Sequence, residues 1–111
     1  MTKTILSINS NRSMNYLFET ILSDKYDFVG AADIYAGVKE LKKNRTIDLI
    51  LMDVDGQTGE TWEFIHHINT SSLYQKVLIA VTSDKSEMMR EKMMDANIHD
   101  FVFKPFSPAD L

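Results

Sequence analysis

Four polar stretches each follow an apolar run, and they carry the residues of this chain that could do chemistry. The residues concerned are Asn9, Ser10, Asp53, Thr82 and Lys104. A carboxylate, a hydroxyl and an ammonium group can act together on a ligand if the fold brings them to one place. Taken singly, Asp53 could cap a loop or pair with Lys104, and Thr82 could be an ordinary strand residue. The interpretation therefore depends on the elements that position these side chains.

The apolar runs alternate with amphipathic stretches, which is typical of strands followed by helices. Strands are predicted at residues 4–8, 26–32, 48–53, 77–81 and 101–103. Four consecutive apolar residues from Leu49 to Met52 indicate a strand buried on both faces, as in parallel sheets. Helices are predicted after the first four strands, and Ser107-Pro108 is typical of a helix start. The sequence thus predicts an α/β fold with a doubly wound parallel sheet and a truncated fifth helix.

Each helical stretch is predicted to turn one apolar face toward the sheet. The first begins after a cap at Ser10 or Asn11, and its inward residues are Met14, Leu17, Phe18, Ile21 and Leu22. Asp33 is predicted to cap the second, whose inward residues are Tyr35, Val38 and Leu41. The third presents Trp62, Phe64, Ile65 and Ile68, and the fourth presents Met89, Met93 and Ala96.

Composition excludes several classes of protein. The chain has 111 residues and no cysteine, which indicates one domain without disulfides, cysteine-ligated metals or thiol catalysis. A net charge of −4 argues against direct nucleic-acid binding. No apolar stretch approaches the length of a membrane span or a signal-peptide core, so we expect a cytoplasmic domain that does not engage a membrane.

Ligands of doubly wound sheets bind at the carboxyl ends of the strands, where the polar residues named above are expected. Three motifs at this edge, in chain order, resemble the receiver domain of bacterial response regulators. They are Leu49-Ile50-Leu51-Met52-Asp53, the run Val77 to Thr82, and Asp100-Phe101-Val102-Phe103-Lys104-Pro105-Phe106. The resemblance covers the whole chain and implies the flavodoxin-like strand order 2-1-3-4-5. It also implies a role in two-component phosphorelay signalling.

The resemblance implies a role for each motif residue. Asp53 would be the phospho-acceptor, whose carboxylate attacks phosphorus. Thr82 would donate a hydroxyl hydrogen bond, and Lys104 would supply positive charge to a phosphoryl oxygen. Phe101 would be the aromatic switch residue. The Lys104-Pro105 peptide bond would be cis, and without metal Asp53 and Lys104 are expected to interact directly or through water.

Other positions depart from the family pattern. The family holds Mg²⁺ with two acidic residues after the first strand, and Asn9 and Ser10 stand there instead. Mg²⁺ prefers carboxylate oxygens, so this change predicts weak metal binding. Gln57 and Thr61 replace a usual proline and glycine. Asp55 lies where the family binds Mg²⁺ through a backbone carbonyl. Its carboxylate could partly compensate for the acidic residues that Asn9 and Ser10 replace.

Three alternatives stay open. Asp53-Val54-Asp55-Gly56 also resembles the nucleophile motif of haloacid-dehalogenase-type phosphatases, with Asp53 as nucleophile and Asp55 as general acid. A flavodoxin-like flavin site would need a phosphate-binding loop after the first strand, which residues 9–13 match poorly. A fully functional phospho-accepting receiver is the third.

Our interpretation is a degenerate receiver that is not an enzyme and serves as a regulatory protein-interaction module. It would bind no firm cofactor, Mg²⁺ weakly at most, and a sensor histidine kinase or another signalling protein. Because the fifth helix is cut short at Leu111, one sheet face is expected to lie partly open. We therefore expect residues 1–111 to be a single domain at the N-terminal end of a longer protein, or to form a homodimer.

Overall fold

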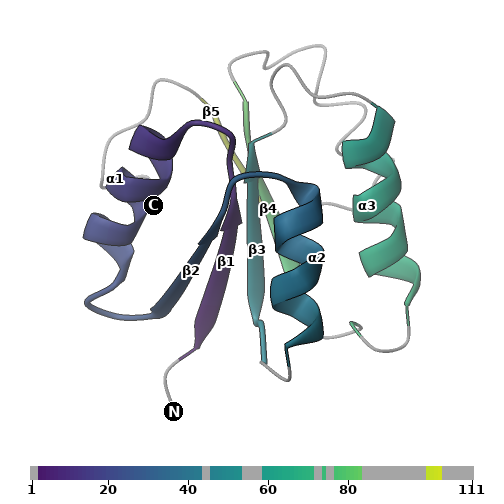
Figure 1. The fold of residues 1–111 in the computed structure, drawn as a ribbon, viewed down its shortest axis with the longest axis horizontal. Coiled ribbons are helices and arrows are strands. Elements are labelled where there is room, and N and C mark those ends of the chain that lie inside the picture. Colours follow the sequence, from purple (N-terminus) through teal and green to yellow (C-terminus); the bar gives the residue numbers. More distant parts are fainter. Residues whose placement is uncertain are drawn as a thin grey trace.

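The computed structural model describes residues 3–43, 46–53, 59–71, 74, 77–83 and 100–103. These residues form one parallel sheet with helices on both faces (Figure 1). The expected α/β class is confirmed. The predicted fourth helix, the start of the fifth, Asp55, Gln57, Lys104 and Pro105 lie outside the described residues.

The sheet has five strands in the order β2-β1-β3-β4-β5, and every neighbouring pair is parallel. The predicted order is confirmed for the first four strands, and β5 pairs with β4. The strands are β1 (Thr4–Ile8), β2 (Asp27–Ala31), β3 (Leu49–Asp53), β4 (Leu78–Ser83) and β5 (Asp100–Phe103). Their bounds agree with the predicted ranges to within two residues. All carboxyl ends consequently meet at one edge of the sheet, which we call the carboxyl edge.

Three helices occur in the described residues: α1 (Arg12–Leu22), α2 (Ile34–Lys42) and α3 (Gly59–Thr70). Helix α1 covers one face of the sheet, whereas α2 and α3 cover the other (Figure 1). Asn11 caps α1 by accepting a hydrogen bond from the Met14 amide, and Asp33 caps α2 through the Ala36 amide. No helix in the described residues is long and apolar enough to cross a membrane.

The core is divided into two clusters by the sheet. The larger cluster lies under α2 and α3 and includes Ile50, Ile65, Ile68 and Ile79, which are fully buried. Helix α2 approaches β1 closely here, and Gly37 allows the approach. A Cβ atom added at Gly37 would stand only 2.6 Å from Ile8 Cδ1. The smaller cluster lies under α1 and consists of Ile5, Phe18, Leu22, Leu51 and Ala80.

Some predicted inward residues are not buried. Tyr35 is 73% exposed, and its ring lies beside Lys39, whose Nζ is 4.8 Å from the ring centroid. Leu17 is 41% exposed, so the inward face of α1 is narrower than predicted. Leu78 is 50% exposed although it begins an apolar strand. Its register partner Leu49 packs with the smaller cluster, which places Leu78 on the α1 side.

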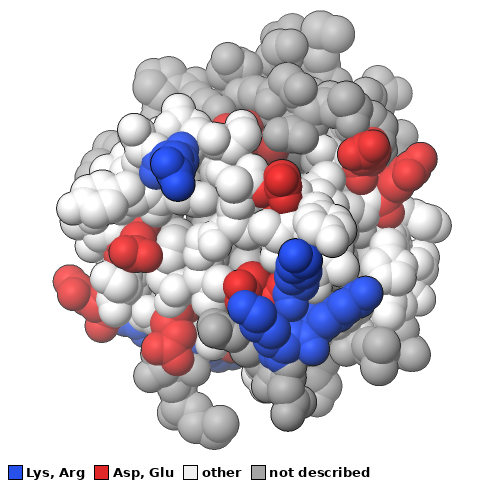
Figure 2. Space-filling model, viewed as in Figure 1, with Lys and Arg blue, Asp and Glu red and all other residues white. Residues whose placement is uncertain are grey.

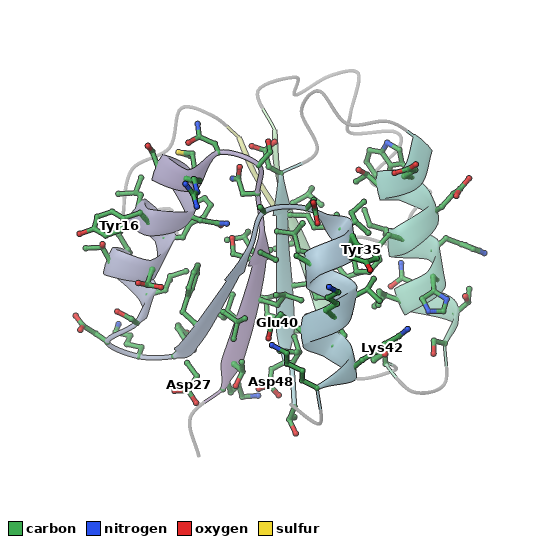
Figure 3. The ribbon with its side chains drawn as sticks, viewed as in Figure 1. Tyr16, Asp27, Tyr35, Glu40, Lys42 and Asp48 are labelled. Atoms are coloured by element: carbon green, nitrogen blue, oxygen red, sulfur yellow. The ribbon has the colours of Figure 1, made fainter. Side chains whose placement is uncertain are left out.

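Basic side chains lie at the end of α2, and acidic side chains lie at the amino ends of the strands. Figure 2 shows basic side chains gathered on one part of the visible face, and α2 carries Lys39 and Lys42 in its last turn. Lys43 Nζ also lies 3.1 Å from Glu40 Oε1. At the amino ends of the strands Asp48 accepts the Thr4 amide at 2.8 Å, which joins β3 to β1. Figure 3 shows Asp27 and Asp48 at this end, opposite the carboxyl edge.

Candidate functional site

One register row at the carboxyl edge brings together three of the predicted site positions. Ile8 pairs with Met52 between β1 and β3, so Asn9 and Asp53 are one step further along neighbouring strands. Asp53 in turn pairs with Thr82 on β4. Neighbouring strands lie about 4.8 Å apart, so the backbones of Asn9, Asp53 and Thr82 form a continuous row. Val81 pairs with Phe101, which puts the predicted switch position one row before Thr82.

Asn9 is held firmly at the end of β1. Its backbone amide donates to the Ala31 carbonyl at 3.0 Å, which continues the contact between β1 and β2. Its side-chain Oδ1 accepts the Asn11 amide at 2.9 Å. A backbone N–H can only donate, so this hydrogen bond fixes which amide atom is oxygen and which is nitrogen. Asn9 is only 3% exposed, and its Nδ2 is buried with no hydrogen-bond partner among the residues that the structure describes.

A buried polar network fixes the same strand end to α1. Ser7, which is fully buried, donates its hydroxyl to Asn15 Oδ1 at 2.6 Å. Asn15 Nδ2 donates to the carbonyls of Ala31 at 3.1 Å and Asn9 at 3.3 Å. The sequence interpretation missed Asn15, although a serine inside an otherwise apolar strand signals a polar partner, because buried hydroxyls are normally hydrogen-bonded.

A hollow of about 150 Å³ opens beside Asp53 at this edge. Its polar lining is Ser10, Asp33, Asp53 and Glu60, and its apolar lining is Ile8, Ala32, Ile34 and Met52. Asp33 was predicted only as a helix cap, and Glu60 was not singled out. Glu60 stands in the first turn of α3, where a carboxylate interacts favourably with the helix dipole, so its sequence position alone indicates a role in helix stability.

The described residues fit a magnesium ion poorly. Asn9 Oδ1 is a neutral oxygen that already accepts one backbone amide, and the other side-chain atom, Nδ2, is a donor that cannot bind a cation. Ser10 offers a neutral hydroxyl, and Asp33 uses one oxygen to cap α2. Within the described ranges no group of three acidic, histidine or cysteine side chains is placed to hold a metal ion. Thr61, the other departure from the family loop, is fully buried in α3.

Comparison with known sequences indicates the family. The family model for the response regulator receiver domain matches residues 5–111. The hybrid signal transduction histidine kinase D of Dictyostelium discoideum is 28% identical over 110 residues, which are 96% of this chain and 7% of that protein. The histidine-protein kinase BarA of Escherichia coli K12 is 28% identical over 108 residues, which are 95% of this chain and 12% of that protein. The chain thus spans a small part of the length of these relatives.

Solved structures share the fold. The chemotaxis response regulator CheY4 of Vibrio cholerae superposes with a TM-score of 0.85 at 22% identity, covering 99% of this chain and 92% of that one. A response regulator from Thermotoga maritima superposes with a TM-score of 0.83 at 22% identity, covering 97% of this chain and 89% of that one. The family match favours the receiver interpretation over the phosphatase and flavin alternatives. With the strand order, the position of Asp53 at the end of β3 and the match over residues 5–111, this chain belongs to the response regulator receiver domain family.

Proposed function

We propose that Asp53 holds the phospho-acceptor position of this receiver, but that its Mg²⁺-dependent phosphorylation is weak or absent. The domain then acts as a regulatory protein-interaction module and not as an enzyme. Its partner is a sensor histidine kinase or another signalling protein in two-component signal transduction. Thr82, Phe101 and Lys104 take the roles that the family resemblance gives them, and the Lys104-Pro105 peptide bond is predicted to be cis.

One observation supports this proposal more than any other, namely the orientation of the Asn9 amide. In the family this position carries a carboxylate that attracts Mg²⁺. Here the Asn11 amide occupies Asn9 Oδ1, so the buried end of the side chain is an N–H₂ group. A metal ion beside it would meet hydrogen atoms with partial positive charge. Metal ions supply much of the charge neutralisation in phosphoryl transfer, so weak binding predicts slow transfer to Asp53.

Mg²⁺ binding by isothermal titration calorimetry tests the proposal. We expect wild-type protein to bind Mg²⁺ with a dissociation constant weaker than about 1 mM. The double variant Asn9→Asp with Ser10→Asp should bind much more tightly, because it returns two carboxylates to the edge. Adding Asp53→Asn to the double variant should remove the gain. Wild-type binding in the micromolar range contradicts the proposal and favours a fully functional receiver.

Asp55 needs its own control, because its carboxylate could compensate for Asn9 and Ser10. If wild-type binding proves tight, the single change Asp55→Asn identifies the source. A large loss of Mg²⁺ affinity in that variant assigns the site to Asp55, and no loss assigns it to other groups.

A further inference from the structure

The unpaired amide nitrogen of Asn9 calls for a physical explanation. Leaving a buried donor without an acceptor costs about 1–3 kcal/mol, and native proteins hold few such groups. Rotating the side chain would not remove the cost, because the Asn11 amide would then lose Oδ1. Such a donor can take its acceptor from a ligand, a modification or an ordered water molecule.

The surroundings of Asn9 keep this donor in a fixed position. Three interactions fix the residue: its amide with Ala31, its carbonyl with Asn15, and its Oδ1 with the Asn11 amide. Asn15 is itself fixed by Ser7. The Nδ2 atom therefore does not need to be ordered when an acceptor arrives, and preorganised donors of this kind bind anionic oxygens well.

The neighbouring register position indicates which acceptor it would meet. Asn9 directly follows β1 and Asp53 is the last residue of β3, each one step beyond the paired residues Ile8 and Met52. If the alternation of side chains continues for that step, both side chains are on the face opposite to that of Ile8 and Met52. A phosphoryl group on Asp53 would bring three oxygens to this edge. We propose that Asn9 Nδ2 donates a hydrogen bond to a phosphoryl oxygen carried by Asp53, so that the edge binds this group without Mg²⁺.

This inference rests on the proposed assignment of Asp53 as the phospho-acceptor, and it deepens that proposal. The absence of a metal ion slows transfer of a phosphoryl group to Asp53, whereas a fixed donor stabilises that group once it is bound. An equilibrium binding experiment measures the stabilisation without the rate of transfer. Beryllofluoride is a suitable probe, because it coordinates a carboxylate oxygen and presents a tetrahedral shell like that of a phosphoryl group.

The test is beryllofluoride binding followed by ¹⁹F NMR, in EDTA and again in excess Mg²⁺. We expect wild-type protein to bind in EDTA nearly as well as in Mg²⁺. Asn9→Leu, which keeps the size but removes the donor, should weaken binding in EDTA by about 10- to 100-fold, the usual range for a hydrogen bond to a charged group. The matched control Asn69→Leu changes the same residue type in the last turn of α3 and should bind as wild type does.

A second variant covers the case in which Asn9→Leu does not fold. Asn9→Asp replaces the donor with a negative charge, so it should bind beryllofluoride poorly in EDTA and recover in Mg²⁺. Wild-type binding that requires Mg²⁺, or no wild-type binding in either buffer, overturns the inference. So does an Asn9→Leu variant that binds as wild type does. The calorimetric Mg²⁺ affinity, measured without beryllofluoride, separately decides the proposed function.

Discussion

The two faces of the sheet differ in how they are packed. Under α2 and α3, the larger cluster is continuous and almost wholly apolar, with Ile50, Ile65, Ile68 and Ile79 fully buried. Under α1, the smaller cluster is accompanied by the buried polar network of Ser7, Asn15 and Asn9 and by the half-exposed Leu78. The first face supplies more of the hydrophobic stabilisation, whereas the second positions the polar end of β1.

This difference explains how one small sheet combines stability with a polar edge. Apolar packing stabilises without fixing any one hydrogen-bonding atom, whereas a polar network orients particular donors and acceptors. The Ser7 hydroxyl and both polar atoms of the Asn15 side chain have partners, whereas Asn9 Nδ2 is a buried donor without one among the described residues. Changes on the two faces should therefore affect different properties.

The largest effect is expected in the larger cluster. Ile65→Ala removes buried methyl groups from the centre of α3 and should lower the free energy of unfolding by about 2–5 kcal/mol. Leu78→Ala, a comparable truncation at a half-exposed position on the α1 side, should cost well under half as much. Urea denaturation of both variants measures the difference. Equal losses would contradict the assignment of the two faces.

The next effect concerns the polar network. Asn15→Ala leaves the Ser7 hydroxyl and the Ala31 carbonyl without this partner, which should cost about 1–3 kcal/mol of unfolding free energy. The double variant with Ser7→Ala should recover part of that loss, because it removes the stranded hydroxyl. Strict additivity of the two changes in a double-mutant cycle would show that the pair is not coupled.

The helix caps should give a smaller effect. Asn11→Ala and Asp33→Ala each remove the side chain that accepts an amide of the first turn, at a cost of about 1 kcal/mol. Serine at either position should restore most of the stability, since its hydroxyl accepts the same amide. Thermal denaturation of the alanine and serine variants provides the measurement, and equal melting temperatures within each pair would disprove the capping role.

The smallest effect is expected on the outer surface. Tyr35→Ala removes an exposed ring and its contact with Lys39, and an exposed cation–π pair is worth about 0.5–1 kcal/mol. Stability should therefore change by no more than that amount, in denaturation curves recorded at low and high salt. A loss comparable to that of Ile65→Ala would mean that Tyr35 is part of the core, as the sequence pattern predicted.

Much of the fold could be predicted, because strand burial leaves a direct record in the sequence. The apolar run from Leu49 to Met52 identified β3, and its position among the other runs gave the strand order through the family resemblance. Tyr35 was predicted wrongly because a tyrosine at helical spacing resembles a core residue, although its ring can equally lie along an exposed lysine. Periodicity does not distinguish these cases.

The site was predicted in part. Asn9, Asp53 and Thr82 were expected at one edge, and the strand register confirms that their backbones meet in one row. The orientation of the Asn9 amide was not predicted, although an asparagine that accepts the amide two residues further on is a common turn-forming contact. The network through Asn15 depends on how α1 lies against β1. The roles of Phe101, Lys104 and Pro105 stay predictions.

Phosphorylation of Asp53 tests the central claim most directly. Wild-type protein, the double variant Asn9→Asp with Ser10→Asp, and Asp53→Asn are each incubated with acetyl phosphate and Mg²⁺, and intact-protein mass spectrometry follows the added phosphoryl group. The account predicts little labelling of wild type, clear labelling of the double variant, and none of Asp53→Asn. Rapid, Mg²⁺-dependent labelling of wild-type protein on Asp53 would contradict it.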